Sequence, residues 1–472
     1  MSSQVFNPYL PLNEYVPDGE PRVFGDRIYI YGSHDEAGGT LYCPGHYVGW
    51  SAPIDDLSHW KYHGEIYRRT QDPSNTEDKL QLWAPDVVQG PDGRYYLYYC
   101  FSFRPEFGVA VSDSPSGPFE FYGHIHYSDG RILSEHCPFD PAVLVDDDDR
   151  IFLYYGFAAP PNPRFPDVPL SPGCLVVELE ADMLTVKEPP KICAPGQLSA
   201  AGSSFEGHAF FEAASIRKIN STYYLIFSSQ NSHELCYATS DSPNCGFVYR
   251  GTIISNGDIG FAGRKSAVYA TGNNHGSIAE VNGQWYVFYH RQTHATETSR
   301  QGCAERITIL PDGSIPQVEI TSCGLNDGPL NGDGEYSAAH ACHLTGKDEF
   351  GIIIYGQDRK QHQPYIYQED DALHYIANIK NGTVFGWKYF EFSELHRATI
   401  FVRGDAKGQL ELFVEEPKSG SAMFCSTTVD LNNKEAWIEA MFDLPSALRG
   451  THPIYIRYTG EGSLAVKSIK FY

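Results

Sequence analysis

The sequence predicts an all-β protein, a five-bladed β-propeller followed by a β-sandwich. Aromatic residues make up 14% of the 472 residues, with 32 Tyr and 27 Phe, and 44 Gly and 31 Pro supply turns. A strand–turn–strand unit recurs five times in the larger, N-terminal part, and short alternating strands fill the rest. The length also exceeds the roughly 250 to 300 residues that one hydrophobic core serves, so two units are expected.

The repeat is the strongest signal for a propeller. Each copy has a short apolar strand, a turn rich in Gly, Asp or Asn, and a strand dense in Tyr, Phe and Trp. The spacing leaves room for about four strands per copy, as in a propeller blade. The copies are "EPRVFGDRIYIYGSHD" from Glu20, "APDVVQGPDGRYYLYY" from Ala84, "DPAVLVDDDDRIFLYYG" from Asp140, "EAASIRKINSTYYLIFSS" from Glu212 and "HGSIAEVNGQWYVFYHR" from His275.

Acidic residues recur at the start of these copies. Asp18, Asp140 and Glu212 stand at or just before the first strand of three different blades, and Asp86 has a similar place in the second blade. Because the innermost strand of every blade lines one central shaft, we expect carboxylates that are distant in sequence to become neighbours there.

Three such carboxylates suit the hydrolysis of a glycosidic bond. That reaction needs a protonated carboxylic acid on the leaving-group side and an ionised carboxylate on the other face of the sugar. A third carboxylate beside the acid raises the acid's pKa by like-charge repulsion. Glu212, which follows Phe210 and Phe211, is the best candidate for the raised acid.

These segments, in this order over most of residues 5 to 323, resemble the family 43 glycoside hydrolases. The resemblance implies a five-bladed propeller, Asp18 as general base, Asp140 as the residue that tunes and orients the acid, and Glu212 as general acid. It also implies inversion at the anomeric carbon. The motif "PDGEP" departs from the family pattern, so Glu20 competes with Asp18 for the role of base.

The resemblance also suggests three further site residues, each with an alternative. Trp83 in "LWAPD" is expected to wall the subsite for the terminal sugar, or else to lie in the core between blades. Arg300 in "TSRQG" would donate to a sugar hydroxyl, or form a surface ion pair. His275 in "NNHGS" would lie beside a structural calcium or sodium ion, or be a buried hydrogen-bonded histidine. No cofactor is expected for the chemistry itself.

The domain boundary is predicted at a Gly- and Asp-rich linker over 326–335, between a propeller at 1–325 and a second domain at 336–472. The second domain shows short segments such as "GIIIYG", "RATIFVRG" and "PIYIRYTG", with turns near every tenth residue, which indicates a β-sandwich. It resembles a family 6 carbohydrate-binding module, a jelly roll. Phe385, Trp387 and Tyr389 could form a sugar platform there or pack in its core.

Charge and termini limit the partners and the compartment. A formal net charge of −24 disfavours nucleic acid and anionic membranes. The N-terminus has no basic region followed by an apolar run, and the 11 Cys are odd in number without a CxxC pair. We therefore expect a cytoplasmic protein with reduced thiols; the oligomeric state stays open.

The leading hypothesis is an inverting exo-glycosidase that removes terminal β-D-xylosyl or α-L-arabinofuranosyl residues from small plant-derived oligosaccharides. An endo-arabinanase or exo-galactanase on the same scaffold is the alternative within enzymes, since pocket depth is set by loops. A carbohydrate-binding protein without catalysis is the alternative outside them, although a binding shaft would not need three carboxylates.

Overall fold

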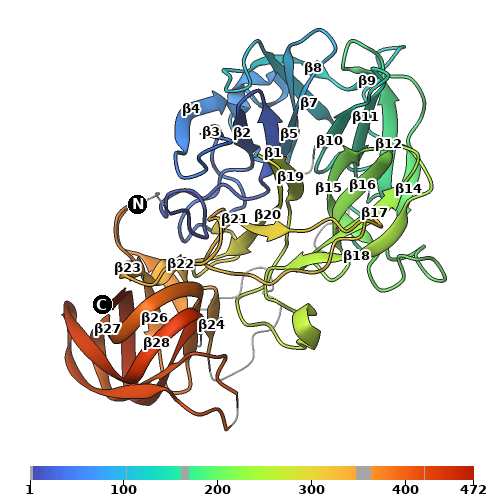
Figure 1. Cartoon of the computed structure of the whole chain (residues 1–472). Coiled ribbons are helices and arrows are strands. Elements are labelled where there is room, and N and C mark those ends of the chain that lie inside the picture. The colour runs from blue at the N-terminus through green and yellow to red at the C-terminus, as the bar shows by residue number, and fades with distance from the viewer. Residues whose placement is uncertain (1–3, 103, 161–169, 347–362, 419) are drawn as a thin grey trace.

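The computed structural model describes residues 4–102, 104–160, 170–346, 363–418 and 420–472. Figure 1 shows two units, a ring of blades running from blue to yellow and a curled orange-to-red sheet beside it. The predicted five-bladed propeller and the β-rich second unit are confirmed. The predicted segment "GIIIYG" lies outside the described residues. No helix within the described ranges is long and apolar enough to cross a membrane.

The propeller blades are antiparallel sheets, with one parallel pair at the edge of blade three. Blades one, two and four have four strands each: β1 (Glu20–Phe24), β2 (Arg27–Tyr31), β3 (Tyr47–Pro53), β4 (Lys61–Tyr67); β5 (Leu82–Gln89), β6 (Tyr95–Phe101), β7 (Phe107–Ser112), β8 (Glu120–His124); and β15 (Phe210–Ile219), β16 (Thr222–Ser229), β17 (Glu234–Ser240), β18 (Val248–Ser255). Blade three combines β9 (His126–Tyr127), β10 (Ala142–Val145), β11 (Ile151–Tyr155), β12 (Gly173–Leu179), β13 (Thr185–Val186) and β14 (Lys191–Pro195). Blade five has β19 (Ser277–Val281), β20 (Gln284–Gln292) and β21 (Arg300–Ile307), and short 3-10 turns lie at η1 (Arg69–Gln71), η2 (Pro73–Asn75) and η3 (Phe261–Gly263).

The repeated sequence unit forms the inner hairpin of each blade. Between β19 and β20 the two turn residues, Asn282 and Gly283, both have positive φ (50° and 79°), as a tight two-residue hairpin turn requires. The aromatic second strands are buried between neighbouring blades, which is why they read as nearly continuous apolar runs; Tyr98, Tyr154, Phe227 and Phe288 are all fully buried.

The five inner strands close a ring around one shaft. In order, β1 contacts β5, β5 contacts β10, β10 contacts β15, β15 contacts β19, and β19 returns to β1. The N-terminal segment completes the closure beside blade five. The amide of Tyr9 donates to the carbonyl of Gly302, and the side chain of Asn7 exchanges hydrogen bonds with the backbone of Ala304.

Buried charges fill the shaft between the inner strands. Arg22 of β1 makes a two-pronged ion pair with Asp86 of β5 and also donates to the Val143 carbonyl of β10. Arg217 of β15 pairs with Glu20 of β1, with the Nη2 to Oε1 distance 2.6 Å. This cluster ties blades one to four together, and it accounts for two of the acidic residues that the repeat placed near the shaft.

The second unit is one sheet that curls round an apolar core. Its elements are β22 (Leu330–Asn331), β23 (Gly334–Ser337), η4 (Ala338–His340), β24 (His343–Thr345), β25 (Tyr365–Gln368), β26 (His374–Ile379), β27 (Val384–Phe413) and β28 (Cys425–Phe471). The long β28 folds back on itself, so that Val402 of β27 pairs with both Ile438 and Val466. The many short strands expected from the sequence are therefore joined into two bent runs.

The structure of the second unit differs from two expectations. Strand β22 and the start of β23 lie inside the stretch predicted as a linker and pair with β27 and β28, because that stretch supplies edge strands to the sheet. Phe385 and Trp387 are fully buried, and Tyr389 donates to Glu319 at 2.5 Å. The first two are core residues and cannot offer a sugar platform.

The two units share a core and buried polar contacts. Apolar residues of blades four and five, such as Ile226 and Val287, belong to the same cluster as the core of the second unit. Lys388 of β27 is buried and pairs with Asp258 and Glu319 of the propeller at 3.1 and 2.8 Å. The second unit therefore packs against blades four and five as part of one body.

We predict that Asp86→Asn destabilises the protein by about 3–5 kcal/mol, because it removes the nearer of the two carboxylates that pair with the buried Arg22 guanidinium. Thermal or denaturant unfolding measures the change. Asp92→Asn, which removes an exposed partner of Arg94, is the matched control and should leave the unfolding midpoint unchanged. An equally small effect of both substitutions would contradict a structural role for the shaft cluster.

Candidate active site

The three predicted carboxylates meet at the shaft. Asp18 and Asp140 lie two residues before β1 and β10, Glu212 lies in β15, and their exposed fractions are 4%, 4% and 8%. His275, just before β19, lies between two of them, with Nδ1 3.6 Å from Asp140 Oδ2 and 4.0 Å from Asp18 Oδ1. The backbone amide of Ala213 donates to Asp140 at 2.8 Å, which places Asp140 beside Glu212.

Unusual backbone geometry accompanies each carboxylate. Asp18, Asp140 and Ala213, the residue after Glu212, have φ of 58°, 50° and 62°, in the left-handed region that non-glycine residues rarely adopt. The register of β15 against β16 also shifts on both sides of Glu212. Such conformations persist only where the surroundings impose them, and they are concentrated at functional sites.

Asp18 is held in its ionised form. Burial alone would raise its pKa, but the Arg300 guanidinium, with Nη1 2.9 Å from Oδ1, holds that pKa well below its usual range. Asp18 is therefore a carboxylate at any physiological pH.

Asp140 and Glu212 have the opposite electrostatic environment. Burial raises the pKa of Glu212 to about 8, and the negative charge of Asp18 adds to the effect. Burial likewise raises the pKa of Asp140, and its neighbour Glu212 adds to that shift. Asp140 accepts a hydrogen bond from the Ala213 amide, which favours its ionised form, whereas the Glu212 carboxyl accepts no hydrogen bond from any described residue. Glu212 is therefore the group that retains the proton more readily.

Arg300 is a buried residue and not the surface cation of the alternative prediction. Its exposed fraction is 2%, and its guanidinium also makes a two-pronged pair with Asp35, with distances of 2.8 and 3.1 Å. The ring of Tyr42 lies below it, with the guanidinium carbon 4.8 Å from the ring centroid. A contact of Arg300 with a sugar hydroxyl stays a prediction.

His290 and Asp35 take part in this site but were not assigned to it from the sequence. His290 is fully buried at the end of β20; its Nδ1 accepts from the Asp18 amide and its Nε2 contacts the carbonyl of Asn273. Asp35 follows the second strand of blade one. The available signal was their common place at the end of the second strand of a blade, in "YHR" and "YGSHD".

Trp83 begins a row of aromatic side chains that reaches the carboxylates. Its ring meets Phe139 edge-on, with centroids 5.2 Å apart, and Phe139 stacks on Phe157 at 4.7 Å. Phe157 in turn contacts Phe211 at 5.5 Å. Trp83, Phe139 and Phe211 are half-buried, and Phe139 and Phe211 directly precede Asp140 and Glu212 in the chain. Phe210, by contrast, is a core residue.

Glu20 does not share the environment of Asp18. Its carboxylate accepts from Ser215 and pairs with Arg217 in the shaft cluster, so both charge and hydrogen bonding are satisfied. Of the two candidates for the base, Asp18 is the one that lies with Asp140 around His275.

The family model of glycosyl hydrolases family 43 matches residues 12–315, which include all three carboxylates. The chain belongs to glycosyl hydrolase family 43. It is thus a glycoside hydrolase of an inverting family, and the prediction made from the repeat and its carboxylates is confirmed at that level.

The similarity to known proteins extends over both units of this family 43 enzyme. A xylosidase/arabinosidase of Thermoclostridium stercorarium is 47% identical over 480 residues, 99% of each chain. A solved family 43 β-xylosidase/α-arabinofuranosidase from a compost metagenome, in complex with xylotriose, is 30% identical, with a TM-score of 0.52 over 66% of this chain and 97% of that one. An arabinoxylan arabinofuranohydrolase from Bacillus subtilis, 22% identical, shares the fold over 98% of this chain and 97% of that one, with a TM-score of 0.51.

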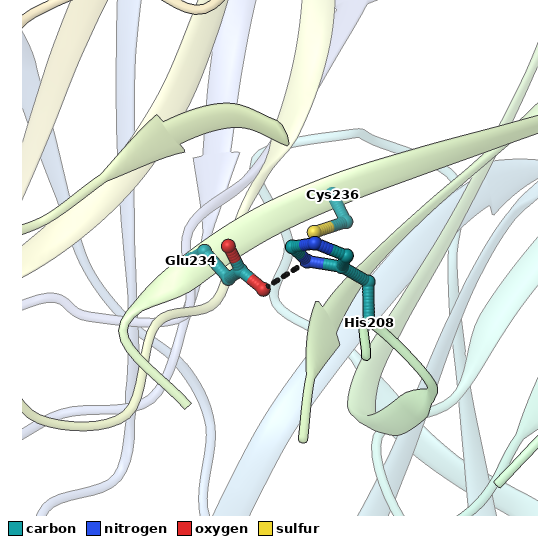
Figure 2. Close-up of side chains that lie close together, drawn as sticks. All are labelled: His208, Glu234 and Cys236. Atoms are coloured by element: carbon teal, nitrogen blue, oxygen red, sulfur yellow. Dashed lines mark hydrogen bonds and ion pairs between the residues drawn. The ribbon is translucent and has the colours of Figure 1, made fainter. Parts of the chain in front are cut away.

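Two places in the enzyme have side chains of the kinds that bind metal ions. Figure 2 shows the first, where His208, Glu234 and Cys236 converge on blade four. Glu234 is already bound by His208 at 2.6 Å and by the side chains of Ser229 and Asn231, and these contacts lower its pKa to about 2 against the effect of burial. Burial holds the Cys236 thiol protonated by raising its pKa. The cluster is a hydrogen-bonded support below β15.

The second place lies next to His275. The amide oxygens of Asn256 and Asn274 are buried and accept no hydrogen bond within the described part of the chain, although the amide nitrogens of both residues are bound. The His233 carbonyl accepts from both residues and brings them together. Uncharged oxygens of this kind suit a hard cation such as calcium or sodium.

Proposed function

We propose that this family 43 enzyme removes terminal β-D-xylosyl and α-L-arabinofuranosyl residues from small xylo- and arabino-oligosaccharides. Asp18 acts as general base, Glu212 as general acid, and Asp140 tunes and orients the acid. The observation that carries the proposal is the electrostatic division of the site, in which Arg300 holds one buried carboxylate ionised while burial raises the pKa of the other two.

The reaction follows from that division. Asp18, ionised beside Arg300, removes a proton from a water molecule whose oxygen attacks the anomeric carbon. Glu212 donates its proton to the glycosidic oxygen as the bond from that oxygen to the anomeric carbon breaks. Asp140, fixed by the Ala213 amide, orients Glu212, and its negative charge, once it ionises, raises the pKa of Glu212 further. The product sugar has the inverted configuration.

Sugar binding is assigned to the aromatic row and to Arg300. Trp83, Phe139 and Phe211 are half-buried, Phe211 directly precedes Glu212, and aromatic rings of this kind can stack on the C–H face of a sugar ring. Arg300 Nη1 reaches Asp18, so a sugar hydroxyl beside the base would be within its range. The preference for xylose and arabinose rests on the full-length relative, which is named a xylosidase/arabinosidase.

The proposed site also includes a hard cation beside His275. The free amide oxygens of Asn256 and Asn274 would contribute to holding it beside His275, where its positive charge would stabilise the nearby carboxylates. A related family 43 structure is described as a calcium-free form, which is consistent with calcium binding in that protein.

We predict release of nitrophenol from both nitrophenyl β-D-xyloside and nitrophenyl α-L-arabinofuranoside, and xylose from xylobiose. Glu212→Gln should lose about 10²- to 10⁴-fold in kcat on xylobiose, whose leaving group needs a proton, and much less on a dinitrophenyl xyloside, whose leaving group does not. Glu206→Gln, on the exposed loop before β15, is the control and should retain full activity. Equal losses on both substrates would refute Glu212 as the acid.

We predict that kcat/KM falls as the pH rises through about 8, because Glu212 must be protonated and burial raises its pKa to that value. Asp140→Asn removes a like charge beside Glu212 and should move this alkaline limb to lower pH, along with any loss of rate. The acid limb should stay in place, since Asp18 remains paired with Arg300. A limb that does not move would exclude Asp140 as the residue that tunes the acid.

We predict that removing divalent and monovalent metal ions with a chelator and a sodium-free buffer lowers the melting temperature, and that adding calcium or sodium restores it. Asn274→Ala, which deletes one of the two free amide oxygens, should weaken this response. Identical melting with and without either ion would rule out a cation at His275.

A further inference from the structure

Tyr15 lies where the segment that carries the proposed base meets the second unit. Its ring is buried, with an exposed fraction of 3%, and Asp18 follows it three residues later. The Tyr15 hydroxyl donates to Gln368 Oε1 of β25 at 2.7 Å and lies 2.8 Å from His294 Nε2. One phenol thus joins the segment before β1, the loop after β20 and a strand of the second unit.

The backbone of Tyr15 is tied to the residue that holds Arg300. The Asp35 amide donates to the Tyr15 carbonyl at 2.9 Å, and the Asp35 carboxylate makes the two-pronged pair with Arg300. Arg300 Nη1 lies 2.9 Å from Asp18 Oδ1, and the chain from Asp18 back to Tyr15 closes a circuit of four residues. Tyr15 is the member of this circuit whose side chain leaves it for the second unit.

A further contact holds the segment before Tyr15 to blade five. Gln301, the residue after Arg300, donates from Nε2 to the carbonyls of Leu12 and Glu14 at 2.8 and 3.0 Å. Blades one and five thus fix the backbone of this segment, while the hydroxyl of Tyr15 contacts the second unit.

The hairpin of β25 and β26 presents two polar side chains to this junction. Gln368 and His374 are directly opposite each other in its register, so their side chains share one face. His374 Nδ1 lies 3.3 Å from His294 Nε2, and Ile366 of β25 pairs with His294 in a parallel bridge. His294, Ile366 and His374 are all buried. The hairpin is therefore packed against the loop that follows β20.

We propose that Tyr15 is a positioning residue for the general base, and that the second unit acts on catalysis through it by fixing the Arg300–Asp18 pair. The hydroxyl, bound on two sides, sets the place of a backbone segment on which Asp35 and Asp18 both depend. No contact between the second unit and the sugar is required. The inference rests on the proposed role of Asp18 as base and adds the second unit to it.

The circuit around Asp18 gives the direction of the effect. Asp18 stays ionised because the Arg300 guanidinium lies against it, and a looser pair lets the pKa of Asp18 rise. The acid limb of kcat/KM then appears at higher pH, because the base must be ionised. The alkaline limb, which belongs to Glu212, keeps its place. A merely structural weakening would lower activity without moving the acid limb alone.

Tyr15→Phe tests the proposal, because it keeps the ring and removes the hydroxyl. On nitrophenyl β-D-xyloside we expect kcat to fall about 10- to 100-fold and the acid limb to lie at least about one pH unit above that of the wild type. The attack of water needs the base whatever the leaving group, so the loss should be as large on a dinitrophenyl xyloside, unlike that of Glu212→Gln. Tyr367→Phe, at an exposed position of β25, is the matched control and should retain the wild-type rate and pH profile.

Gln368→Leu removes the acceptor from the second unit and leaves Tyr15 intact, so it decides the matter if Tyr15→Phe fails to fold. It should move the acid limb in the same direction. An acid limb that stays in place in the folded variant, or a shift of both limbs together, would overturn the inference and leave the proposed function intact. A wild type inactive on both nitrophenyl glycosides would instead refute the proposed function, and the inference with it.

Discussion

The closed ring of inner strands is the constraint on which the rest of the structure depends. Each of the three site carboxylates comes from a different blade, so their distances are fixed only if the blades are fixed. The ion pairs of Arg22 with Asp86 and of Arg217 with Glu20 supply part of that rigidity from within the shaft. Their charges compensate one another away from water, which makes the ring sensitive to the loss of any one partner.

The different protonation states of the three carboxyl groups arise from one difference in their surroundings. Asp18, Asp140 and Glu212 are equally buried, and burial alone would raise the pKa of all three. Only Asp18 has a guanidinium against it, and Asp35 holds that guanidinium in place from the other side. The buried Arg300 guanidinium therefore decides which carboxylate is the base. The negative charge of Asp18 in turn raises the pKa of Asp140 and of Glu212.

The second unit contributes to the organisation of the site from outside it. Gln368 accepts from Tyr15, three residues before Asp18, and Tyr15 also contacts His294, which lies just beyond β20. The buried Arg291 follows His290 in β20, so its side chain points to the reverse side of the same strand. The segments that carry Asp18 and His290 are thus supported by the second unit, which gives it a structural role whether or not it binds sugar itself.

The sequence by itself determined the propeller and the three carboxylates, because a repeated local pattern forms the same hairpin each time and equal positions in a ring become neighbours. It left Asp18 and Glu20 as rivals, did not assign His290 or Asp35 to the site, and assigned β22 to a linker. Only the tertiary structure decided these, since they depend on pairings between residues far apart in the chain, such as Arg300 with Asp18 and Asp35 or Arg217 with Glu20. The sequence does not show which partner a charged residue will meet in the folded chain.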